Sequence, residues 1–333
     1  MSAVKQKEVT MSSHMQGAKA HTQQRMHGMS RKIAVIMAFA GLIAMPQTAF
    51  NGVCSGLRLW AEVVFPALFP ALVITSCILS LFKMKKSVSY IYIILTGFLC
   101  GFPVGASLCS DYHMNNPEEK VCSTLSAFCN ISSPSFVVNY IIFANMKDQF
   151  PIPVILLCIY LPVIECILAM LMIYRKDIFE GLKKGDCKNS GENFEKSSGK
   201  TAINQESEHF FDILDNAIWK SIKSVLKLGG YIVVFSCIAS YLALIPAADY
   251  VKGIMCGITE ITNGIYLCAN LNIMPEARLF IITALNAFGG ISTLMQTAGI
   301  SDSAFFDIKK YTYNKCVLTI VTMLNTAFIM CIL

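Results

Sequence analysis

The chain has 333 residues, of which 55% are hydrophobic and only 14% are charged. Soluble domains are about a quarter charged, so this composition excludes an ordinary soluble protein and predicts a polytopic membrane protein. Much of the formal net charge of +6 lies in the N-terminal segment and in short loops, which indicates membrane topology and not nucleic-acid binding.

The N-terminal segment is polar and basic, and an apolar run follows it directly. Residues 1–32 hold six lysines and arginines against one acid, and they are predicted to form a disordered cytoplasmic tail. Residues 33–50 are predicted to be an N-terminal transmembrane helix, because the run is long for the apolar core of a signal peptide. A cleaved signal peptide is the alternative.

Several further apolar runs predict membrane helices. Between them, residues 175–207 are hydrophilic and are predicted to form a cytoplasmic linker. Residues 208–224 are amphipathic and are predicted to lie along the membrane surface and to lead into the next span. In chain order the apolar runs are 60–82, 88–109, 121–146, 151–174, a span ending near 244, 250–271, 277–298 and 311–333.

Three short matches predict an internal repeat. The segment "ITSCILSLF" at 74–82 resembles "VFSCIASYL" at 234–242, and "AFCNIS" at 127–132 resembles "AFGGIS" at 287–292, both 160 positions apart. "GASLC" and "GIYLC" match at nearly the same offset. We therefore expect a first repeat at 55–174 and a second at 208–333, with chance similarity between apolar helices as the alternative.

The charge pattern predicts how the two repeats are oriented in the membrane. Lys83, Lys85 and Lys86 should be cytoplasmic, and so should the linker. Both conditions hold if residues 88–109 form a re-entrant hairpin that turns at Gly101–Gly105, where glycine and proline supply a tight turn. Three crossings then lie between the starts of the two repeats, and this odd number inverts the second repeat. The predicted fold class is an all-α polytopic membrane protein with two inverted repeats, each holding a re-entrant hairpin and a broken transmembrane helix. Lys309, Lys310 and Lys315 fit as a cytoplasmic flank of the last span.

Four breaks in apolar runs form the candidate site. They lie at 101–106, 129–135, 259–264 and 286–296. Helix breaks at membrane depth can bind solutes through free N–H and carbonyl groups, although small residues also allow close helix packing. The two broken helices are expected to face each other. The candidate substrate-binding residues are Gly101, Pro103, Gly105, Asn130, Ser132, Ser133, Glu260, Asn263, Gly289, Gly290, Ser292 and Gln296.

Two carboxylates lie within apolar runs. Glu260 is beside Asn263, and an intramembrane carboxylate is a functional hypothesis by default. It could carry a proton, bind Na⁺ or bind the solute, and a neutral Glu that holds the hairpin is the alternative. Glu165 lies in an uninterrupted run, so structural and functional roles stay open. The coupling ion, Na⁺ or H⁺, is likewise open.

The sequence predicts neither an enzyme nor a metal site. The 14 cysteines are scattered singly without a C-x-x-C pair, so we expect reduced packing residues. There is no nucleophile–base constellation, no phosphate-binding G-x-x-x-x-G-K and no H-E-x-x-H. Catalysis and ATP-driven transport by this chain alone are therefore not expected, and no resident cofactor is predicted.

Four motifs resemble a known family. "GFPVGASLCSDY", "EEKVCSTLSAFCNISSPSFVV", "GITEITNGI" and "AFGGISTLMQT" are similar in order and spacing to the YlbJ-type sporulation integral membrane proteins of spore-forming Firmicutes. That family carries the nucleoside-recognition Gate domain and is distantly similar to concentrative nucleoside transporters. The resemblance covers roughly 55–330. It departs at Ser133, where a glycine is expected before the proline of the first broken helix.

The resemblance implies a secondary transporter of a small anionic solute during sporulation. The solute that it implies is dipicolinic acid, moved from the mother cell across the outer forespore membrane. A nucleoside-type transporter and a non-transporting scaffold or regulator of spore formation are the alternatives. The implied location is multi-pass in the bacterial cell membrane, with the solute and the bilayer as partners, no nucleic acid, and homo-oligomerisation left open.

Overall fold

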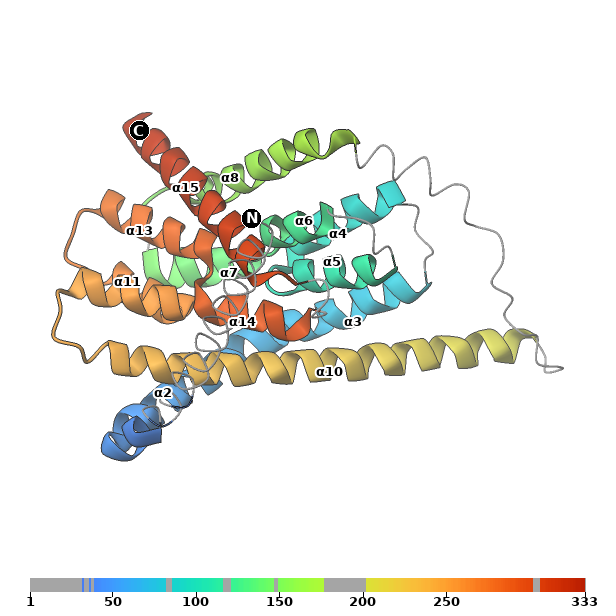
Figure 1. Ribbon diagram of the computed structural model, residues 1–333, viewed down its shortest axis with the longest axis horizontal. Coiled ribbons are helices and arrows are strands. Elements are labelled where there is room, and N and C mark those ends of the chain that lie inside the picture. Colours follow the sequence, from blue (N-terminus) through green and yellow to red (C-terminus); the bar gives the residue numbers. More distant parts are fainter. Residues whose placement is uncertain are drawn as a thin grey trace, which may run out of the picture. The chain divides into compact units, whose positions relative to one another are not determined.

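The computed structural model describes residues 32, 36, 39–81, 86–115, 121–146, 149–176, 202–301 and 306–332. Every regular element in these ranges is a helix, and two stretches are π-helical (Figure 1). The contacts divide the chain after Phe50, and the packing described below concerns Asn51–Leu333. In chain order the elements are α2 (Pro46–Leu59), η1 (Trp60–Val64), α3 (Phe65–Leu81), α4 (Lys86–Cys100), α5 (Val104–Asn115), α6 (Val121–Cys129), α7 (Pro134–Phe136), η2 (Val137–Met146), α8 (Ile152–Ile173), α10 (Ala202–Leu242), α11 (Asp249–Thr259), α12 (Ile261–Ala269), α13 (Pro275–Phe288), α14 (Gly290–Ile300) and α15 (Ile308–Ile332).

Five helical segments of the described chain are long and apolar enough to cross a membrane. A bent pair, Pro46–Val64 with Leu68–Ile78, would make a sixth. The prediction of an all-helical polytopic membrane protein is therefore confirmed. The five segments are Val121–Met146, Ile152–Ile173, Phe210–Leu242, Pro275–Ile300 and Ile308–Ile332.

Several predicted boundaries differ from the structure. A helix runs through residues 51–59, so the predicted spans at 33–50 and 60–82 are not separated there. Residues 1–31 and 177–201 lie outside the described chain, and with them most of the predicted tail and linker. The last residues of the predicted linker, 202–207, begin α10.

Helix α10 joins the predicted amphipathic segment to the span that follows it. It continues without interruption from Ala202 to Leu242, 41 residues that extend for about 60 Å (Figure 1). Residues 208–224 are the N-terminal part of this helix and not an element of their own. The sequence there contains no proline, which would have interrupted the backbone hydrogen bonds.

Two pairs of short helices form helical hairpins. Helix α4 packs against α5, and α11 packs against α12. The arms have 9 to 15 residues, so none is long enough alone to cross a hydrocarbon core of about 30 Å. Gly101 turns the first hairpin with φ +75°, where a side chain would be strained, and Glu260 turns the second in extended backbone.

The arms of the second hairpin approach very closely at two glycines. A Cβ atom at Gly264 would collide with the backbone of Gly257 and would lie 3.2 Å from the Gly253 carbonyl oxygen. Only hydrogen fits between these backbones, so this contact depends on residue size. Close approach through small residues is the usual way in which membrane helices pack.

Two helices are broken within their apolar runs. In the first, α6 ends at Cys129, residues 130–133 are non-helical, and Pro134 begins α7 and η2. Ser133 caps this restart, because its Oγ accepts a hydrogen bond from the Phe136 backbone N–H. In the second, Gly289 ends α13 in the left-handed region, with φ +83°. Both predicted breaks are therefore present in the backbone.

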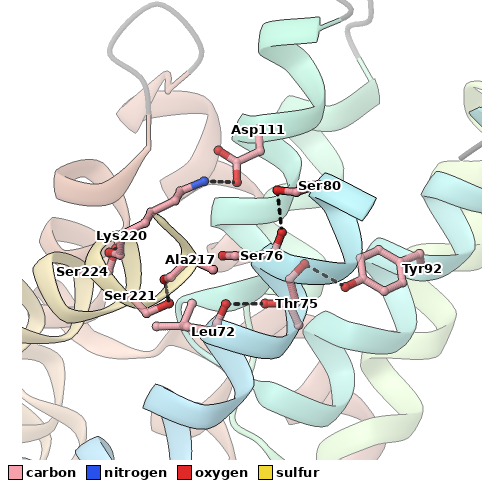
Figure 2. A network of polar contacts seen from close by, with 10 residues as sticks. All are labelled: Leu72, Thr75, Ser76, Ser80, Tyr92, Asp111, Ala217, Lys220, Ser221 and Ser224. Atoms are coloured by element: carbon pink, nitrogen blue, oxygen red, sulfur yellow. Dashed lines mark hydrogen bonds and ion pairs between the residues drawn. The ribbon is translucent and has the colours of Figure 1, made fainter. Parts of the chain in front are cut away.

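Polar contacts attach the first hairpin to its neighbours α3 and α10 (Figure 2). Lys220 of α10 donates to Asp111 of α5 over 2.8 Å, and Tyr92 of α4 donates to the Thr75 carbonyl of α3 over 3.4 Å. The lysine is exposed, and exposed ion pairs contribute at most about 1 kcal/mol. The buried apolar core includes residues of these helices and continues through α6, of whose nine residues only Ser123 is not buried.

Candidate functional site

The two helix breaks lie against each other in the interior. From the first break, Ser132 Oγ donates to Asn286 Oδ1 over 2.6 Å. Asn130 Nδ2 donates to Thr297 Oγ1 over 2.8 Å and to the Tyr311 hydroxyl over 2.7 Å. All five side chains are buried. Segments 154 to 181 positions apart are thus joined by side-chain hydrogen bonds at one place.

Each hairpin tip reaches one of the breaks. A Cβ atom at Gly101 would lie 2.5 Å from the Ser133 backbone nitrogen, and one at Gly290 would lie 3.1 Å from the Gly257 carbonyl oxygen. The Phe102 ring comes within 3.3 Å of a Cβ position at Gly289, so the first tip also touches the second break. We name residues 101–103, 130–133 and 286–290 the junction.

Three of the predicted residues support the first break. Pro103 is buried in the turn of the hairpin. Ser133 caps the restarting helix, so the serine that replaces the expected glycine has a hydrogen-bonding use. Gly105 lies outside the junction in α5, where a Cβ atom would collide with the Cys129 carbonyl oxygen. Close packing of α5 on α6 therefore accounts for Gly105.

Ser292 and Gln296 lie on α14, just after the second break. The Gln296 side-chain amide donates to Ser292 Oγ over 2.8 Å, and both side chains are buried. Thr297, the next residue, is the one that receives the Asn130 amide. Sequence reasoning did not single out Thr297. The available signal was the polar pair Thr293 and Thr297, which are four residues apart and therefore share one face of α14.

Glu260 and Asn263 form a second polar group at the tip of the other hairpin. Glu260 is buried and caps α12, since its Oε2 accepts from the Asn263 backbone N–H and side-chain amide, each over 2.9 Å, and from the Thr262 hydroxyl. Asn263 also donates to Ser236 Oγ of α10 over 3.3 Å. None of the carboxylate's hydrogen bonds in the described chain reaches Asn130 or Ser132, so Glu260 lies outside the junction.

Replacing Glu260 by Ala is expected to lower the free energy of unfolding by about 1–2 kcal/mol, because three donors at the start of α12 lose their acceptor. Thermal unfolding of the purified protein in detergent would measure the loss. Glu276→Ala is the matched control, since Glu276 is exposed in the first turn of α13. Equal losses in both variants would contradict the capping role.

Lys315 is a second site residue that sequence reasoning missed. It is 1% exposed, and its Nζ donates to the Asn130 carbonyl oxygen over 2.5 Å. The ammonium lies 5.2 Å from the centre of the Phe102 ring and 5.9 Å from that of Tyr311. The prediction that placed it on a cytoplasmic flank with Lys309 and Lys310 is wrong for Lys315, because α15 already begins at Ile308 and turns this residue inward.

Glu165 makes one notable contact on α8. The Asn325 amide of α15 donates to its Oε2 over 2.8 Å, while the Glu165 side chain remains exposed. The two positions differ by 160, which is the offset of the predicted repeat. Among the described residues, no three His, Cys, Asp or Glu side chains come together as a metal site.

Spanning helices with buried polar breaks define a multi-pass integral membrane protein. Over 296 residues the chain is 23% identical to "Sporulation integral membrane protein YlbJ" of Bacillus subtilis (strain 168). The matched region covers 78% of this chain and 72% of the relative. The chain is a distant relative of this YlbJ-type family, as the motifs predicted. No family model and no solved structure matches the chain, and the similarity to concentrative nucleoside transporters stays a prediction.

Proposed function

We propose that the chain is a secondary transporter that moves a small anionic solute across a membrane during spore formation. The observation that carries this proposal is the junction, where two broken helices meet with a hairpin tip on each. Non-helical backbone at membrane depth is costly unless it is buried in protein or lines a water-filled cavity, and transporters place solute sites at such breaks. The relative's name supports the link to sporulation.

Helix packing supports two inverted repeats. Helices α3 and α10 occupy equivalent places in the two halves and pack together, and so do α8 and α15. Contacts between non-equivalent helices are matched in the same way. Helix α6 packs on α15, and their counterparts α13 and α8 pack on each other. Helix α5 packs on α14, and their counterparts α12 and η2 pack on each other. A twofold relation between the halves produces this exchange. The short hairpin arms then enter the membrane without crossing it, and one repeat moves against the other.

The N-terminus of α14 supports an anionic solute. This helix of 11 residues begins at Gly290 in the buried junction, where its free N–H groups and the positive end of its dipole favour negative charge. Dipicolinic acid, an aromatic dicarboxylate, is the solute implied by the family resemblance, and the outer forespore membrane is the membrane that it implies.

Uptake by the purified full chain in liposomes tests the proposal. We expect labelled dipicolinate to accumulate faster than in protein-free liposomes and to saturate with concentration. Accumulation of uridine alone would favour the nucleoside-type alternative. A folded protein that moves neither solute would overturn the proposal and leave the scaffold alternative.

A further inference from the structure

Lys315 is a buried cation without a negative partner in the described chain. An ammonium group is normally buried only with a carboxylate or several acceptors, because its desolvation is costly. Lys315 has one carbonyl, Asn130 O, and the faces of two aromatic rings. The group carries three N–H donors, and the hydrogen bond to Asn130 uses one of them.

The described helices around α15 supply no carboxylate that pairs with the Lys315 ammonium. Helices α6 and α14 contain no acidic residue. The acid of α8, Glu165, binds Asn325, which lies ten residues and about 15 Å along α15 from Lys315. The acid of α13, Glu276, is exposed in its first turn. Asp307, just before α15, accepts from the backbone of Lys309 and Lys310.

A second polar group without a partner in the described chain lies at the same place. Asn130 is fully buried, and its Oδ1 accepts no hydrogen bond from the described residues. Most buried polar atoms in proteins have a partner. An unused acceptor and a cation with unused donors are therefore both found at Asn130, on the first helix break.

We infer that Lys315 binds a carboxylate group of the solute, which replaces the Asn130 carbonyl as the partner of the ammonium. The inference rests on the proposed function and names the residue that recognises the anion. One ammonium balances one carboxylate, whereas phosphate dianions usually recruit arginine or several donors. The rings of Phe102 and Tyr311 beside the ammonium favour a flat, aromatic carboxylate.

The exchange connects binding to the first hairpin. Phe102 belongs to its tip and covers the ammonium, and Asn130 belongs to the break against which that tip lies. An entering carboxylate displaces contacts of both. Recognition of the anion and release of the hairpin tip thus involve the same atoms, which a neutral nucleoside would not engage.

Binding to the purified full chain in detergent tests the inference by titration calorimetry. The probes are dipicolinate, its neutral analogue pyridine-2,6-dicarboxamide, and inorganic phosphate. We expect wild type to prefer dipicolinate over both, and Lys315→Met to weaken dipicolinate binding about 10- to 100-fold. Lys309→Met, an exposed lysine of the same helix, should change it less than about twofold.

Several outcomes overturn the inference. They are equal binding of dicarboxylate and dicarboxamide by wild type, preference for phosphate, no carboxylate binding at all, and full affinity in Lys315→Met. If that variant does not fold, the wild-type preference and retained binding by Lys315→Arg decide. Liposome uptake distinguishes failure of this inference from failure of the proposed function. If the protein transports nucleosides and Lys315→Met does not change the rate, it is a transporter that does not recognise a carboxylate through Lys315. If dipicolinate binds but is not taken up, Lys315 recognises the anion in a protein that is not a transporter.

Discussion

Replacing Asn130 by Ala is expected to reduce solute uptake into liposomes at least about tenfold. The side chain provides the two side-chain hydrogen bonds that join the first break to Thr297 of α14 and Tyr311 of α15. Its loss removes the donor to two buried hydroxyl oxygens, of which Thr297 keeps its own hydrogen bond to the Thr293 carbonyl. A buried acceptor left unsatisfied costs about 1–3 kcal/mol. The geometry of the junction then depends on Ser132 alone for its direct side-chain link to the second break.

Asn139→Ala is the matched control for this experiment. Asn139 is exposed on η2, and within the described ranges its amide donates only to Ser135 of the preceding turn. Initial uptake rates at equal amounts of reconstituted protein should therefore distinguish the two variants. If Asn130→Ala transports like Asn139→Ala, the junction is not the solute path.

Replacing Gly264 by Ala is expected to cause the largest loss of stability, about 3 kcal/mol or more. The added methyl group meets the backbone of Gly257 and the Gly253 carbonyl, and backbone cannot rotate away as a flexible side chain can. The two arms of the second hairpin must separate, which exceeds the usual cost of adding a methyl group to a packed core. Size-exclusion profiles after a heat step would record the loss.

Gly230→Ala separates this steric effect from helix propensity. Gly230 lies in α10, and a Cβ atom there would have no neighbour within 4 Å. Alanine at this position should stabilise the helix by about 0.5–1 kcal/mol. A similar change in both variants would show that the close approach of α11 and α12 does not determine the stability of the hairpin.

The breaks in the fold were predictable because backbone chemistry marks them. Pro134 cannot continue the hydrogen bonds of α6, and Gly289 ends α13 in a conformation that glycine tolerates. The offset of 160 positions linked these two places. Which side chains meet there was not predictable, since the hydrogen bonds of Asn130 join residues 167 and 181 positions apart and depend on how α14 and α15 are turned.

Lys315 shows why a charge can mislead. Three lysines before an apolar run are typical of a membrane flank, and two of them fit that pattern. The phase of the helix was the available signal: Lys315 shares one face with Tyr311, Leu318 and Thr322, all buried. Burial of a lysine on that face follows from the packing of α15 on α6 and α13, which one sequence does not reveal.

Asn130 also determines how its segment can move. Its side chain holds Tyr311 and its carbonyl holds Lys315, and these two residues lie one turn apart on α15. A displacement of residues 130–133 away from α15 breaks both hydrogen bonds, so the free-energy cost of moving this segment includes both. Losing either bond should shift the equilibrium toward the displaced position by up to the free energy of that bond, about 0.5–1.5 kcal/mol.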